Sequence, residues 1–200
     1  MNVLDHLIIF LPGSPAVDAL FPGPAGLILD AGTRHVGQGT RNRRALLADC
    51  YLELVWVDSP VDARASGLRF QDRCDGKACP FGVVVRGRAP AASGFLDYTV
   101  PGGPTLKILD DPALPFVGVF DDPDNNGPLR GSRRQHLEHR NPNMLQHAEI
   151  SSRTAAPDIA VARVTFVRSE PKLTLTLTGV PGPLSLVAPG DQQPVRWQWK

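Results

Sequence analysis

Two short stretches decide the fold: residues 4–10 (LDHLIIF) and residues 51–56 (YLELVW). Each predicts a short buried strand, because aliphatic, β-branched and aromatic side chains dominate both. The first carries His6 and the second carries Glu53. An ionisable group on an apolar sheet is costly unless it has a partner, and a shared metal ion is a favourable partner for both. His6 and Glu53 are therefore the first candidates for a functional site.

Strand geometry predicts which side chains lie beside these two groups. Successive side chains of a strand point to opposite faces of the sheet. Asp5 is therefore expected on the opposite face from His6. The side chains expected beside His6 are Leu4, Ile8 and Phe10, and those expected beside Glu53 are Tyr51 and Val55.

The chain between the two stretches predicts one compact unit. Ser14 followed by Pro15 is a typical helix start, so a short helix is expected over residues 16–21. Two further strands are expected over residues 26–31 and 43–48, on either side of a glycine-rich loop. The order of the unit is β-α-β-β-β.

This order resembles the module of the vicinal oxygen chelate superfamily, which includes glyoxalase I, extradiol dioxygenases and bleomycin-resistance proteins. Residues 32–42 (GTRHVGQGTRN), followed by YLEL at residues 51–54, resemble the signature of its glyoxalase-like domain family. The resemblance implies an α+β fold in which paired βαβββ modules form a curved mixed sheet, as a single domain over residues 1–200.

An internal repeat suggests how the modules are arranged. Residues 144–150 (MLQHAEI) resemble residues 3–9 (VLDHLII), and in each a histidine follows a leucine by two places. A helix over residues 157–164 is expected after the second copy. Whether this last module pairs with the first is left open. The expected modules are approximately 1–60, 80–122 and 144–190, with connecting loops at 61–79 and 121–143.

The resemblance also implies a metal site. Proteins of the superfamily take one ligand from the first strand and one from the last strand of a module. Mapped onto this chain, His6 and Glu53 fill both positions of the first module, and His147 fills one position of the last, where Ser185 replaces the expected carboxylate. Such a set suits Fe, Mn, Ni or Zn as a divalent ion with open positions for an oxygen substrate. The alternative is a metal-free core in which His6 is hydrogen-bonded, Glu53 pairs with an arginine and His147 faces solvent.

The glycine-rich loop supplies the remaining candidates. His35 is a candidate acid or base, and Glu53 is a candidate catalytic carboxylate beside it. His139, in the sequence HRN at residues 139–141, resembles a histidine–asparagine element of the family and is a further ligand-binding candidate. The alternative for the glycine-rich loop is a tight turn between strands that needs glycine for its geometry alone. The loop residues predicted to bind a ligand are Gly37, Gly39, Thr40, Arg41 and Asn42.

Composition excludes several function classes. A formal net charge of +1 gives no electrostatic case for nucleic acid. The apolar run at residues 7–11 is too short for a membrane span or a secretory core, and an odd count of three cysteines indicates a reducing cytoplasm. A disulfide between Cys74 and Cys79 is expected only on exposure to air. With 19 glycines and 20 prolines, the chain predicts many turns and few long helices.

Two functions follow from the resemblance. The first is a metal-dependent lyase, isomerase or dioxygenase that acts on a small oxygenated metabolite in the cup of the sheet. The second is a non-catalytic protein of the same fold that binds and sequesters a small molecule. The expected partner is a small-molecule ligand, with the chain as a monomer or a homodimer.

Overall fold

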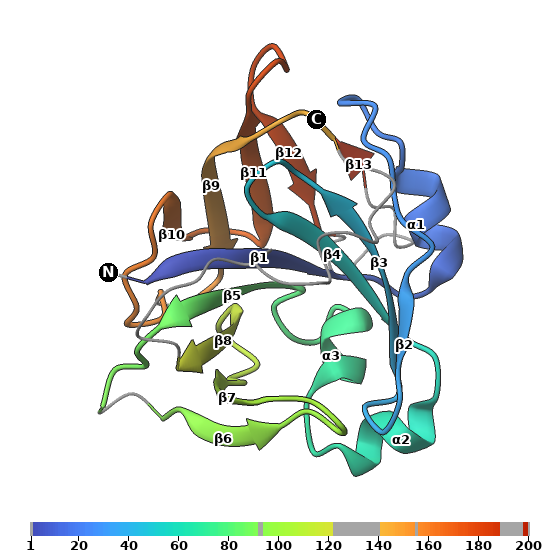
Figure 1. The fold of residues 1–200 in the computed structure, drawn as a ribbon, viewed down its shortest axis with the longest axis vertical. Coiled ribbons are helices and arrows are strands. Elements are labelled where there is room, and N and C mark those ends of the chain that lie inside the picture. Colours follow the sequence, from blue (N-terminus) through green and yellow to red (C-terminus); the bar gives the residue numbers. More distant parts are fainter. Residues whose placement is uncertain (1, 92–93, 122–140, 155, 189–197, 200) are drawn as a thin grey trace.

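Strands dominate the computed structural model, which describes residues 2–91, 94–121, 141–154, 156–188 and 198–199. The described strands form two sheets (Figure 1). Short helices connect the strands of the first sheet. The helices are α1 (Ser14–Leu20), α2 (Pro60–Ala65) and α3 (Phe70–Cys74).

The first sheet contains eight strands in the order β2-β3-β4-β1-β5-β8-β7-β6. Its two halves have the same arrangement. In the first half β1 runs parallel to β4, and in the second half β5 runs parallel to β8; β1 and β5 join the halves as an antiparallel pair. The sheet is mixed and strongly curled, so the predicted α+β fold class is confirmed. The strands are β1 (Val3–Phe10), β2 (Thr33–His35), β3 (Thr40–Leu46), β4 (Tyr51–Val57), β5 (Phe81–Gly87), β6 (Leu96–Thr99), β7 (Thr105–Leu109) and β8 (Phe116–Asp121).

The second sheet has its own topology. Its order is β10-β9-β11-β12-β13, with β9 parallel to β10 on one side and antiparallel to β11 on the other. The prediction of a helix over residues 157–164 is wrong. Pro157 begins an irregular segment, in which Val161 forms isolated β-bridges with Asn2 and with Val164. The strands are β9 (Leu145–Ser152), β10 (Val164–Arg168), β11 (Lys172–Leu177), β12 (Leu184–Val187) and β13 (Gln198–Trp199).

Three local expectations are also corrected. The strands expected over residues 26–31 and 43–48 lie closer together, as β2 and β3, because the glycine-rich loop is itself the turn between them. The expected loop at residues 61–79 contains most of α2 and the whole of α3. Cys74 and Cys79 are free and belong to different apolar clusters, so the predicted disulfide is not formed.

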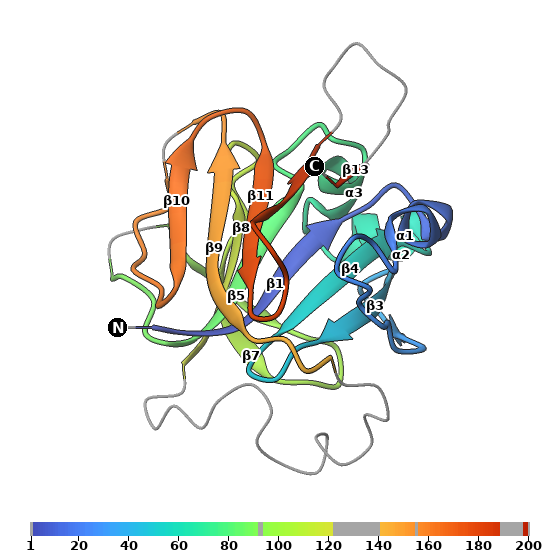
Figure 2. The same ribbon diagram turned by 90° about the horizontal axis from the view of Figure 1, so that it is seen from above.

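Apolar clusters cover both faces of the first sheet. The second sheet packs on the outer face, where Leu7 and Leu54 join Ile150 and Leu175 in one cluster. Figure 2 shows this second sheet standing beside β1 and β5. On the inner face α3 packs through Phe70. The inner cluster also contains Ile8, Phe10, Val55, Val84 and Phe116.

A register shift in β1 changes which side chains share a face. Leu4 pairs with Val85 and His6 pairs with Val84, so Asp5 has no partner of its own across the β1–β5 ladder. Such a β-bulge reverses the alternation of the strand. Leu4 accordingly belongs to the outer cluster with Leu7, and the prediction that it shares a face with His6 is wrong. The bulge also turns Asp5 towards the His6 ring.

Arg73 of α3 is fully buried and ties the helix to the second half of the sheet. Its guanidinium donates from Nε and Nη2 to Asp110 Oδ1, at 3.0 and 2.8 Å. It donates further to the carbonyl oxygens of Cys79, Asp111 and Leu114. All five donors of the side chain are therefore used. The positive charge also lies over the ring faces of Phe10 and Phe116.

Replacing Arg73 with methionine is expected to lower the free energy of unfolding by about 3–5 kcal/mol, because the Asp110 charge would lose its cation and keep only the backbone N–H of Arg69 as a donor. Urea unfolding followed by circular dichroism measures this change. The matched control is Arg69→Met, since Arg69 is 51% exposed and makes only a 3.8 Å ion pair with Asp72. Equal loss in both variants would contradict the role given to Arg73.

None of the helices in the described part of the chain is long and apolar enough to span a bilayer.

Candidate functional site

Glu53 is a buried carboxylate on the inner face of the first sheet, and each of its oxygens has a partner. Oε2 lies 3.2 Å from His6 Nε2. Oε1 accepts a hydrogen bond of 2.5 Å from Asn42 Nδ2 and lies 3.7 Å from His35 Nε2. The residue is 9% exposed. The predicted candidates His6, His35, Asn42 and Glu53 therefore form one cluster.

The parallel pairing of β1 with β4 explains how His6 reaches Glu53. Ile8 lies opposite Glu53 and His6 lies opposite Tyr51, so His6 is diagonal to the carboxylate on the same face. The Tyr51 ring stacks on the His6 imidazole, with centroids 4.3 Å apart and an interplanar angle of 15°. This stacking limits the His6 ring to one orientation.

The antiparallel strands β3 and β2 bring the other groups to the same face. Arg44 lies directly opposite Glu53, and Thr40 and Asn42 share its face of β3. His35 of β2 lies opposite Thr40. The Asn42 side chain has a fixed orientation, because its Oδ1 accepts a 2.8 Å hydrogen bond from a backbone N–H. Its Nδ2 is therefore the atom that donates to Glu53.

A second carboxylate, that of Asp5, contacts the other nitrogen of the His6 ring. His6 Nδ1 lies 2.8 Å from Asp5 Oδ1, and Arg86 Nε donates to Asp5 Oδ2 at 2.8 Å. The Arg86 guanidinium lies 5.0 Å from the centre of the Phe120 ring. A chain of alternating charge thus runs from Arg86 through Asp5 and His6 to Glu53.

The pKa values of His6 and Glu53 are shifted in opposite directions. Burial by itself lowers the pKa of His6, but the hydrogen bonds and charges of Asp5 and Glu53 outweigh it and raise the pKa to about 9. Burial by itself raises the pKa of Glu53, but the hydrogen bond and charge of His6, together with His35 and Asn42, lower it to about 2. His6 and Glu53 are therefore a buried ion pair at neutral pH.

His35 has a different environment. Its side chain is 25% exposed, and its Nδ1 lies 2.9 Å from Thr40 Oγ1. Burial lowers the pKa of His35 below its ordinary value; the charge of Glu53 opposes this, and the charges of Arg44 and His6 add to it. His35 is therefore neutral at pH 7 and in contact with solvent, next to an ionised carboxylate.

The structure does not bring His147 to this cluster. His147 is exposed on β9 of the second sheet, opposite Thr176 of β11. Across the described residues, no three His, Cys, Asp or Glu side chains are arranged to hold a metal ion. His6 and Glu53 supply two facing donor atoms, and the third predicted ligand lies elsewhere. His139 lies outside the described residues.

Contacts within the chain account for the loop glycines. A Cβ on Gly39 would lie 2.2 Å from Ala63 N and 2.5 Å from Ser59 O, at the start of α2. A Cβ on Gly37 would lie 2.9 Å from Pro101 Cγ in the turn between β6 and β7. Both glycines also have a positive φ angle, 80° at Gly37 and 71° at Gly39. Ligand contact by Gly37 and Gly39 stays a prediction.

The polar residues of β3 divide between the two faces of the sheet. Thr40 and Asn42 are 1% and 3% exposed and face the cluster, where they hold His35 and Glu53. Arg41 alternates with them, and its side chain is 47% exposed on the opposite face, 4.0 Å from Asp58. Direct ligand contact by these three residues stays a prediction.

Part of the chain is similar in sequence to a known protein family. Residues 4–97 match the sequence model of the glyoxalase-like domain family. This part of the chain is similar to a glyoxalase-like domain. A solved structure, that of a hypothetical protein from Staphylococcus aureus, is similar with 14% identity and a TM-score of 0.48, over 76% of this chain and 70% of that chain. No curated protein matches the sequence.

Three members of the site were not predicted as site residues. Asp5 was expected on the opposite face, and no sequence pattern reveals the bulge that turns it inward. Arg86 stands at the end of β5, far from His6 in sequence, and reaches the site only through the β1–β5 pairing. Tyr51 was expected on the Glu53 face, but its stacking on His6 depends on the β1–β4 register.

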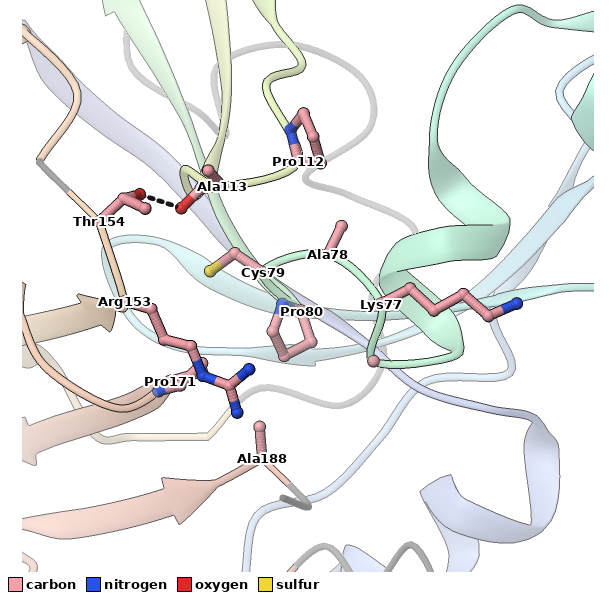
Figure 3. Close-up of a pocket in the computed structure, with 11 residues that line it drawn as sticks. Lys77, Ala78, Cys79, Pro80, Pro112, Ala113, Arg153, Thr154, Pro171 and Ala188 are labelled. Atoms are coloured by element: carbon pink, nitrogen blue, oxygen red, sulfur yellow. Dashed lines mark hydrogen bonds between the residues drawn. The ribbon is translucent and has the colours of Figure 1, made fainter. Parts of the chain in front are cut away.

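A separate pocket of about 200 Å³ lies between the two sheets (Figure 3). Small apolar side chains form most of its lining, and burial raises the pKa of its Cys79 thiol. Its two basic side chains already have acidic neighbours, since Arg153 pairs with Glu170 and Lys77 with Asp75. This pocket contains none of the predicted site residues.

The stability of the folded protein is expected to fall between pH 6.5 and about 9. Because the pKa of His6 is raised from 6.5 to about 9 on folding, its contribution is complete below pH 6.5 and is lost as the pH rises through 9. The shift corresponds to about 3 kcal/mol. Urea unfolding across this pH range measures it.

The matched variant for this measurement is His6→Gln, which is expected to show no loss of stability between pH 6.5 and 9. The Glu53 contribution has the opposite sign, since its lowered pKa makes it complete above pH 4.5 and lost as the pH falls towards 2. A wild-type protein of constant stability from pH 6.5 to 9 would show that His6 is not charged in the folded state.

Proposed function

We propose that the protein binds a small oxygenated metabolite on the inner face of its first sheet and transfers a proton on it, as an isomerase or a lyase. One observation carries this proposal: His35 is neutral, partly exposed and 3.7 Å from the Glu53 carboxylate. A general base must be unprotonated and accessible, and a nearby carboxylate stabilises the cation that it becomes.

The proton transfer uses the two nitrogens of His35 differently. The proposed step uses the His35 tautomer in which Nδ1–H donates to Thr40 Oγ1, so that Nε2, 3.7 Å from Glu53 Oε1, carries the lone pair. Nε2 then accepts a proton from a carbon next to a carbonyl group, and the resulting imidazolium is stabilised by the Glu53 charge. Return of that proton to the neighbouring atom completes an isomerisation, and loss of a leaving group instead completes an elimination.

The buried ion pair keeps Glu53 in place during this step. His6 and Asn42 hold one carboxylate oxygen each, so Glu53 cannot turn away from His35. Their hydrogen bonds also keep Glu53 ionised, because they lower its pKa to about 2. Glu53 is thus a permanent negative charge, and His35 is the group that gains and loses the proton.

A divalent metal ion fits the described residues only in part. His6 Nε2 and Glu53 Oε2 face one another, and Asp5 stands behind His6 as a carboxylate often does behind a metal-binding imidazole. A catalytic metal site usually takes three protein ligands, and the described residues do not complete such a group. No step proposed above passes through a metal. A metal-dependent lyase or dioxygenase is the second candidate, and the Asp5–His6 pair is the observation that favours it.

The test of proton transfer is hydrogen–deuterium exchange at the α-carbon of simple α-hydroxy ketones in D2O, followed by proton NMR. His35→Gln and Glu53→Gln are each expected to slow the catalysed exchange by about 10²–10⁴-fold. The wild-type rate is expected to fall as the pH drops below 6.5, because a protonated His35 accepts no further proton.

Two outcomes would contradict this function. Exchange that is unchanged in both variants would remove His35 and Glu53 from the reaction. Ligand binding without exchange would favour the alternative of a non-catalytic sequestering protein.

Metal content separates the first candidate from the second. Elemental analysis of protein purified without chelator is expected to show no stoichiometric divalent ion, and His147→Gln is expected to leave the exchange rate unchanged. One ion per chain, lost in His6→Ala and in Glu53→Ala, would replace the acid–base mechanism with the metal-dependent one.

A further inference from the structure

Arg44 is a second basic group on the face that carries the site. It lies directly across from Glu53 in the β3–β4 ladder and shares a face with Thr40 and Asn42. Directly opposed residues of antiparallel strands have Cα atoms about 4.5–5.5 Å apart. The guanidinium charge is close enough to His35 to lower the pKa of that imidazole. Arg44 therefore flanks the reacting groups.

Asp30 fixes the position of Arg44. Asp30 is 9% exposed, and its Oδ1 accepts hydrogen bonds from the backbone N–H groups of Gly32 and Arg44, at 3.0 and 2.8 Å. Its Oδ2 accepts a 2.6 Å hydrogen bond from Arg44 Nε. Because the backbone holds this carboxylate, one edge of the guanidinium is held in turn.

The other edge of the guanidinium is available. Among the described residues, nothing accepts a hydrogen bond from the terminal nitrogens of Arg44, and its side chain is 26% exposed. The neighbouring charges are already paired, since Glu53 is bound to His6 and Asp5 to Arg86. A planar pair of N–H donors suits a carboxylate, which it binds through both oxygens.

We propose that Arg44 binds the carboxylate of the metabolite, so that the substrate class is a small 2-oxo or 2-hydroxy acid. This inference rests on the function proposed above and adds the charge of the substrate to it. With its carboxylate on the free edge of Arg44, the rest of the acid lies on the face that His35 and Glu53 share. In a 2-oxo acid the transferable proton is on C3, next to the C2 carbonyl, and in a 2-hydroxy acid it is on C2, so the anchor and the proton acceptor act on one small molecule.

The experiment uses lactate and pyruvate as probes, with their methyl esters as neutral counterparts. Binding is followed by NMR through the side-chain amide of Asn42 and the ring of His35. The acids are expected to bind more tightly than the esters, and Arg44→Gln is expected to weaken acid binding by about 10- to 100-fold. Arg44→Lys keeps a cation beside Asp30 but loses the paired donors, so weaker acid binding is expected there as well.

Arg64→Gln is the control for loss of a positive charge, because Arg64 is exposed on α2 and not on the first sheet. Acids and esters that bind alike, or equal losses in Arg64→Gln and Arg44→Gln, would overturn the anchor. So would the absence of any change at Asn42 and His35 on addition of acid. The proposed function is judged separately, since the exchange of neutral α-hydroxy ketones needs His35 and Glu53 but not Arg44.

Discussion

The buried carboxylate of Glu53 is the constraint on which the inner face of the sheet depends. An ionised group at this depth is stable only when charge and hydrogen bonds compensate for lost hydration. His6 supplies the charge, Asn42 supplies a donor, and Asp5, which Arg86 holds in place, raises the pKa of His6. These partners come from β1, β3 and β5, so the cluster exists only when the strands pair in register.

The two halves of the first sheet share a topology but not a chemistry. The row that contains His6 continues into the second half as Val84 and Gly118. Both positions are apolar, and the inner face there packs against α3 through an aromatic cluster. The imidazoles and the central carboxylate of the site thus lie in the first half, and Arg73 is the buried ionic group of the other. This asymmetry explains why the described residues do not form a complete two-module ligand set.

The second sheet contributes to the hydrophobic core and supplies none of the residues of the described site. It covers the outer face through Ile150 and Leu175, while the site lies on the inner face. The repeat around His147 correctly marks a strand, β9, but that strand pairs with β10 and β11 and not with the first sheet. A similarity over seven residues can predict a strand, but it does not predict which other strands will pair with it.

The sequence by itself determined the fold class and the central pair, because period, composition and a family signature are local properties of the chain. His6, His35, Asn42 and Glu53 were all identifiable in this way. Only the tertiary structure decided that Asp5, Arg86 and Arg44 join them and that His147 does not. The reason is physical: a one-residue bulge reverses the faces of a strand, and the register between strands sets which side chains meet. Both arise from pairing between segments distant in sequence.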